Sequence, residues 1–183
     1  MNRLFLLVAV VATVLLTGCD ELKVEIPVDS VKFDFEAMTR SPESSGVLKS
    51  GTMNPFSGTR TINLNDIEDA DLKEYANKII DVMLDNAYSQ VNVTTVPLGD
   101  YSVFNLKVEI DGISEHLSIA SYKVGDEFVP PANLSSFAAA FFVKLVKEDS
   151  FTVTVSGETD APEGTIVHIS YECYDLKFVA KPL

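Results

Sequence analysis

The amino-acid sequence predicts a mainly β (α+β) protein, an antiparallel β-sandwich or curved sheet with two amphipathic helices packed on it. Residues 151–159 and 165–173 alternate apolar and polar side chains, which is typical of strands with one buried and one solvated face. Asp111-Gly112 is a hairpin-turn signal between two further strand-like segments. Two other segments, beginning at Asp71 and near Asn133, repeat apolar residues at helical spacing.

Length and composition favour one globular domain. The chain has 183 residues, of which 46% are hydrophobic and 22% charged, and it has no long proline, glycine or serine tract. We expect a signal peptide over residues 1–18, a short tether over 19–23 and a single β-rich domain over 24–183. The formal net charge is −13. Because so acidic a surface repels phosphate backbones, nucleic acid is not expected as a partner.

The first strand is expected over residues 24–36. Its apolar positions change from even to odd numbers near Asp29-Ser30, which predicts a bulge or bend at that point. Residues 39–60 are rich in Ser, Gly, Thr, Pro and Asn. We therefore expect a loop there, with at most a short strand around Val47-Leu48.

Two helices are expected in the remainder of the chain. The first starts at Asp71, where Glu74 completes a capping-box pattern, and runs to about Tyr88. The second runs from Asn133 as its N-cap to about Glu148, directly after two prolines that a helix interior would not accommodate. Its apolar positions are Leu134, Phe137, Ala138, Phe141, Phe142 and Leu145.

The two predicted helices align with each other without a gap. Leu72 aligns with Leu134 and Met83 with Leu145, a constant spacing of 134 − 72 = 62 residues, and each segment leads into a strand of the same phase. Two interpretations stay open: an internal duplication into two related helix-strand halves, or two unrelated units with the same pattern.

Two hairpins are predicted. Across a two-residue turn at Asp111-Gly112, Leu106 faces Leu117, although Val108 then faces Glu115. Across the loop 160–164, the register that sets Thr159 opposite Thr165 brings the apolar positions of both strands to one face. That predicted face consists of Phe151, Val153, Val155, Ile169, Tyr171 and Cys173.

The N-terminal residues carry the most specific motif. A positive start precedes an uncharged apolar run over residues 4–16, which is too short to span a membrane and is typical of a signal peptide. The motif Leu16-Thr17-Gly18-Cys19 resembles the lipobox of bacterial lipoproteins. This resemblance implies cleavage before Cys19, lipidation of its thiol, and attachment of the mature chain to a membrane through that lipid.

The residues after Cys19 are compatible with two cellular locations. Asp20 alone resembles the inner-membrane retention signal of enterobacterial lipoproteins, whereas Asp20-Glu21 resembles the surface-export signal of Bacteroidetes-type lipoproteins. We favour the bacterial outer membrane with surface exposure, and an inner-membrane or periplasm-facing position is the alternative. The run Thr61-Ile62-Asn63-Leu64 before an acidic helix start also resembles the small β-rich lipoproteins of uncharacterised function in the second group.

No catalytic residue, cofactor or metal site is predicted. The two histidines, His116 and His168, lie far apart in sequence, and His168 is expected on a solvated strand face. An EF-hand loop beginning at Asp69 fails because Lys73 would occupy an oxygen-ligand position. Cys173 is expected to be a small buried hydrophobic residue rather than a nucleophile.

These observations favour a non-enzymatic, membrane-anchored binding or scaffold module whose partner is an envelope protein or a glycan. Enzymatic function is the least supported, because no motif arranges an acid, a base and a nucleophile. The alternative is a carrier or sensor of an apolar ligand held between helices and sheet. Candidate residues for a glycan-stacking surface are Tyr101, Tyr122 and Tyr174; candidates for lining an apolar cavity are Phe137, Phe141 and Phe142.

Overall fold

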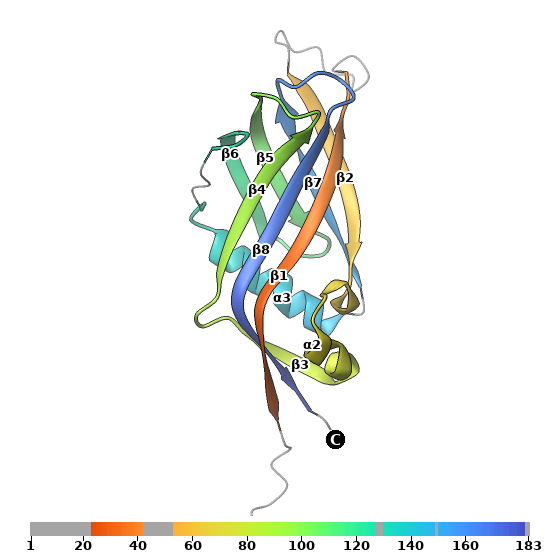
Figure 1. Ribbon diagram of the computed structural model, residues 1–183, viewed down its shortest axis with the longest axis vertical. Helices are drawn as coiled ribbons and strands as arrows, with labels where there is room; N and C mark the ends of the chain where they lie inside the picture. The colour runs from red at the N-terminus through yellow and green to blue at the C-terminus, as the bar shows by residue number, and fades with distance from the viewer. Residues whose placement is uncertain (1–22, 42–52, 127–129, 149, 182–183) are drawn as a thin grey trace, which may run out of the picture.

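The computed structural model describes residues 23–41, 53–126, 130–148 and 150–181. Within them, one eight-stranded antiparallel sheet curls strongly into a half-barrel, accompanied by two α-helices (Figure 1). The predicted fold class is confirmed, in its curved-sheet form. The predicted signal peptide, Cys19 and the Val47-Leu48 segment lie outside the described residues.

The sheet has the order β3-β8-β1-β2-β7-β5-β6, and β4 pairs with β8 on the same side as β3. β4 and β6 therefore form the two edges of the upper half-barrel. The strands are β1 (Val24–Thr39), β2 (Asn54–Ile62), β3 (Ile79–Met83), β4 (Tyr88–Val96), β5 (Ser102–Ile110), β6 (His116–Lys123), β7 (Phe151–Thr159) and β8 (Ile166–Ala180). The helices are α2 (Ala70–Tyr75) and α3 (Leu134–Lys147), with the short 3₁₀ turns η2 (Leu64–Asp66) and η3 (Ala76–Lys78).

The two longest strands, β1 and β8, pair with each other along most of their length. Their ladder runs from Val24 opposite Ala180 to Met38 opposite Ile166, and it omits Asp29. Buried positions change phase there on both strands, and Asp175 on β8 takes a left-handed φ of 56°. The predicted irregularity near Asp29-Ser30 is thus confirmed, and it bends both strands together.

The loop predicted over residues 39–60 is wrong at residue 39 and at residues 54–60, which belong to strands, while residues 42–52 lie outside the described part of the chain. β1 continues to Thr39, and β2 pairs along its whole length with β7. Polar, glycine-containing residues form this strand because β7 supplies its hydrogen bonds. Gly58 is required there, since a Cβ atom would lie 2.0 Å from the carbonyl oxygen of Glu36.

The predicted helix from Asp71 to about Tyr88 is confirmed at its start, but its predicted length is wrong. The helix α2 covers only Ala70–Tyr75, and its N-cap is Asp69, whose carboxylate accepts a hydrogen bond from the Leu72 N–H at 2.8 Å. Residues 79–83 form β3, which pairs with the C-terminal end of β8. Tertiary pairing overrides the helical spacing, so the two segments aligned at 62 residues take different structures.

The predicted second helix is confirmed as α3, which runs along the concave side of the sheet and buries all six predicted apolar positions (Figure 1). Phe141 is fully buried, and its ring centroid lies 5.0 Å from that of Phe33 and 5.4 Å from those of Phe151 and Tyr171. Such aromatic pairs add about 0.5–1.5 kcal/mol each to the burial energy. Asn133 precedes the helix, but its side chain donates to the His116 carbonyl instead of capping.

The hairpin of β5 and β6 is present, but its register differs from the prediction by two residues. Leu106 faces Ile119 and Val108 faces Leu117, and the connection spans residues 111–115. A shift of two keeps every side chain on its predicted face. It also removes the mismatch of Val108 with Glu115, which lies in the connection.

The predicted hairpin of β7 and β8 is wrong. β7 lies between β2 and β5, whereas β8 lies between β1 on one side and β3 and β4 on the other. The loop of residues 160–165 instead crosses the upper end of the half-barrel (Figure 1). All of the residues assigned to the apolar face are nevertheless buried: Phe151, Val153, Val155, Ile169, Tyr171 and Cys173.

Candidate functional site

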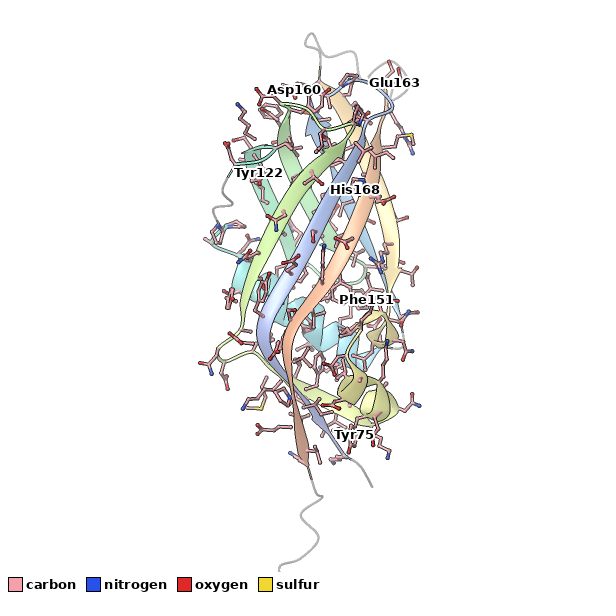
Figure 2. All side chains as sticks on the ribbon, in the orientation of Figure 1. Tyr75, Tyr122, Phe151, Asp160, Glu163 and His168 are labelled. Atoms are coloured by element: carbon pink, nitrogen blue, oxygen red, sulfur yellow. The ribbon has the colours of Figure 1, made fainter. Side chains whose placement is uncertain are left out.

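The outer face of the sheet presents cross-strand rows of side chains from β4, β8 and β1. In antiparallel strands, residues directly opposite each other project on the same side of the sheet. His168 lies on this face, in the upper part of the half-barrel (Figure 2). From the terminal end upward, the rows are Tyr88–Tyr174–Ser30, Gln90–Glu172–Lys32, Asn92–Ser170–Asp34, Thr94–His168–Glu36 and Val96–Ile166–Met38.

The lowest row carries an exposed aromatic pair. The rings of Tyr88 and Tyr174 stack with centroids 4.8 Å apart and planes inclined by 14°. Tyr88, on the edge strand, is 51% exposed. The Tyr174 hydroxyl donates to the Glu172 carboxylate, and this hydrogen bond is the main reason that the pKa of Tyr174 rises to about 12. The pair thus offers aromatic surface next to a hydrogen-bond acceptor.

A pocket of about 380 Å³ adjoins Tyr88. It lies between the β3–β4 turn and the start of α3, and its volume falls in the range of about 300–1,000 Å³ typical of small-molecule sites. Tyr88, Pro130 and Pro131 provide flat, rigid walls, while Asp85 and Ser135 provide polar groups. Ser89 also lines it, although its hydroxyl lies 3.1 Å from the Tyr171 hydroxyl.

We call this combination the tyrosine site: Tyr88, Tyr174, Glu172, Asp85, Ser135 and the adjoining pocket. Its aromatic surface can pack against the apolar face of a ring. Its carboxylates can accept hydrogen bonds from ligand hydroxyl groups, and charge-assisted bonds of this kind are the stronger ones. The arrangement suits a polyhydroxylated ligand.

Only one of the predicted tyrosine candidates belongs to this site. Tyr174 is part of it, whereas Tyr101 and Tyr122 lie at the opposite end of the half-barrel, where the Tyr122 hydroxyl donates to the Asp126 carbonyl. Burial is the main cause of the raised pKa of Tyr122. Sequence reasoning missed Tyr88 because it was assigned to the end of a helix. Its pairing with Tyr174 joins positions 174 − 88 = 86 residues apart, and no local pattern encodes it.

The remaining predicted residues lie apart from the tyrosine site. His168 is on the outer face as predicted, with Nδ1 3.3 Å from the Glu36 carboxylate. His116 is exposed at the start of β6. In residues 23–41, 53–126, 130–148 and 150–181, no group of three or more His, Cys, Asp or Glu residues is arranged to hold a metal ion.

The cysteine and the acidic run also take the positions expected of structural residues. Cys173 is fully buried, and burial is the main cause of the raised pKa of its thiol. In the acidic run, Asp66 completes a capping box with Asn63, and Asp69 caps α2. These carboxylates satisfy backbone N–H groups at helix starts.

The described residues also line hollows elsewhere on the surface. An open groove of about 650 Å³ runs along the outer side of α3, between Ala139, Val143 and the β5–β6 connection. A cavity of about 430 Å³ lies where β1 and β2 diverge; there Arg60 donates to the Asp34 carbonyl and Lys32 pairs with Asp34 and Glu172. Phe137, Phe141 and Phe142 line neither hollow, because they pack against one another and the sheet.

Comparisons of the chain with protein-family models, with curated proteins and with solved structures each find no match. Among the described residues, no helix has both the length and the apolar character needed to cross a membrane.

Proposed function

We propose that this chain is a lipid-anchored, non-enzymatic binding module of the outer-membrane surface and that the tyrosine site binds a glycan. The observation that carries the proposal is the stacked pair of Tyr88 and Tyr174 beside a pocket with polar groups. A pyranose ring has an apolar face that packs on an aromatic ring and hydroxyl groups that need acceptors. Both requirements meet at this site.

The charge of the protein narrows the class of glycan. Glu172 and Asp85 contribute carboxylates to the site, and the whole chain has a formal net charge of −13. An acidic sugar would be repelled at short range and by the overall field. The proposed ligand is therefore a neutral glycan or one that carries amino groups.

The proposed anchor fits the position of the chain ends. β1 begins at Val24, which is 24 − 19 = 5 positions after Cys19, and the outer ends of β1 and β8 lie together at one end of the half-barrel (Figure 1). An extended tether of that length spans at most about 18 Å. A lipid on Cys19 would thus hold this end of the domain close to the membrane.

Calorimetric titration of the soluble fragment that begins at Asp20 tests the glycan proposal. The probes are a panel of neutral and amino-sugar oligosaccharides, and we expect at least one to bind. Tyr88→Ala should weaken that binding about tenfold or more, because it removes the exposed ring, whereas the matched control Tyr122→Ala at the other end should not. Failure of the whole panel, or equal binding by the Tyr88→Ala variant, would overturn the proposal.

A second candidate function is favoured by the groove along α3. Ala139, Val143 and Ile113 give it an apolar lining, and Lys144 and Lys147 lie at its border. A fatty acyl chain would match the apolar lining, and its carboxylate would pair with Lys147, because Lys144 Nζ already lies 2.6 Å from the Glu148 carboxylate. The carrier expected from the sequence would hold its ligand between helices and sheet, whereas this groove lies on the outer side of α3. Mass spectrometry of the purified soluble fragment should then detect a co-purified fatty acid; an empty groove that also fails to bind added fatty acid would eliminate this candidate.

A further inference from the structure

The end of the half-barrel opposite the start of β1 and the end of β8 carries a cluster of exposed apolar side chains. Met38 is 55% exposed, Val96 52% and Leu98 81%. Met38 and Val96 lie on either side of Ile166 in the outermost row of the outer face. We call Met38, Val96, Leu98 and Ile166 the distal tip.

This cluster is not the ordinary scatter of surface hydrophobic residues. Met53 (37% exposed) lies at the same end, because β2 begins there against the end of β1. The other large exposed hydrophobic residues of the described chain lie apart from this end: Ile80 on β3, Val143 on α3 and Tyr88 at the opposite end of β4. Contiguous apolar surface of this kind marks interaction sites, and unbranched Met side chains adapt well to a partner's surface.

Acidic residues outnumber basic ones at the end of the half-barrel that carries the apolar cluster. Asp160 and Glu163 lie in the loop at this end (Figure 2). Asp160 accepts a hydrogen bond from the Ser102 N–H at 2.7 Å, so its position is fixed. The described segments at this end (38–41, 53–56, 97–103, 121–126 and 157–166) contain five acidic and two basic residues, a balance of 2 − 5 = −3.

The negative charge around the distal tip indicates which kind of partner can bind there. Two copies meeting tip to tip would oppose like charges, and an anionic lipid surface would be repelled. A protein surface with an apolar centre and a rim of Lys and Arg would instead match both the apolar cluster and the acidic surroundings. This end also lies opposite the start of β1 and the end of β8, where the proposed anchor would be attached (Figure 1).

We propose that the distal tip is a docking surface for a second, different protein that presents an exposed apolar patch rimmed by basic residues. The contact is independent of the tyrosine site, which lies at the other end of β4, opposite the middle of β8. Met38, Val96 and Leu98 would supply the buried centre of the interface. The acidic rim would steer association and make it sensitive to salt.

Site-specific photo-cross-linking of the full-length protein in its own cells tests the proposal. A photoreactive residue replaces Leu98 in one variant and, as a matched control, Val143 on α3 in another. We expect a discrete adduct with a different protein from position 98 only, and its loss in a background carrying Met38→Ser and Val96→Ser. Absence of an adduct at 98, the same adduct at 143, or an adduct between two copies of this chain would overturn the proposal.

The identified partner is then purified and titrated against the soluble fragment. Binding should weaken about tenfold or more in the Met38→Ser, Val96→Ser double variant and stay unchanged in the control double variant Ile80→Ser, Val143→Ser. It should also weaken as salt rises from about 50 to 500 mM, because the rim charges are screened. An equal loss of affinity in both double variants, or an affinity that does not change with salt concentration, would contradict an apolar tip with electrostatic steering.

Discussion

At the scale of single residues, alternation along each strand decides which side chains enter the core. Val155 on the central strand β7 is fully buried, while the adjacent Ser156 projects outward and lies opposite Lys107 on β5. The two positions are consecutive in sequence and share the same strand neighbours. They differ only in the face of the sheet that they occupy.

The substitutions Val155→Asp and Ser156→Asp should therefore have very different effects on stability. A carboxylate at 155 would be buried without a partner and should lower the free energy of unfolding by several kcal/mol. A carboxylate at 156 faces solvent next to the Lys107 ammonium and should change it by about 1 kcal/mol or less. Urea denaturation of the fragment beginning at Asp20 measures both, and equal destabilisation would refute the assignment of faces.

Residue faces could be predicted from the sequence because they depend on local alternation. Phe151, Cys173 and the apolar positions of α3 are all buried as expected. Tyr88 could not be recognised as part of a site, since its role depends on lying opposite Tyr174 in the folded sheet. The candidate site was thus predicted only in part, through Tyr174.

At the scale of elements, the choice of strand partner depends on the whole fold. Loop 160–165 is short enough for a hairpin, yet β8 pairs with β1 from Val24 to Met38, a longer ladder than β7 could offer. Residues Ile79–Met83 form a strand for a similar long-range reason. They pair with the C-terminal end of β8, whose backbone N–H and C=O groups on that side would otherwise lack partners. Short-range patterns identify strands and helices, but they carry little information about such long-range pairing.

Cys173 provides a direct test of this topology. It lies opposite Val31 on β1, and opposite residues of an antiparallel pair have Cα atoms about 4.5–5.5 Å apart, within disulfide range. The Val31→Cys fragment, refolded from urea under oxidising conditions, should form a bond between positions 31 and 173. The control Phe151→Cys, which a β7–β8 hairpin would place opposite Cys173, should keep both thiols free. Mass spectrometry and thiol counting distinguish the two, and the reverse result would contradict the sheet order.

At the scale of the whole molecule, the two ends of the half-barrel differ in character. The lower end gathers the outer ends of β1 and β8, with α2 and β3 beside them (Figure 1). The upper end carries exposed apolar residues and acidic loops. If the proposed lipid is attached at Cys19, it would hold the first end near the membrane and leave the second end facing away from it.

Replacing Cys19 with Ser should abolish this attachment. Since the thiol is the proposed acceptor of the diacylglyceryl group, the variant should take up no alkyne fatty acid, should retain its leader, and should lose the two-chain anchor that makes membrane binding stable. Metabolic labelling followed by detergent-phase partitioning measures lipid and anchoring together. Cys173→Ser is the matched control, because the thiol at 173 is buried in the sheet and should not be acylated. Label that persists in the Cys19→Ser variant, or disappears in Cys173→Ser, would refute the lipobox assignment and with it the proposed orientation of the two ends.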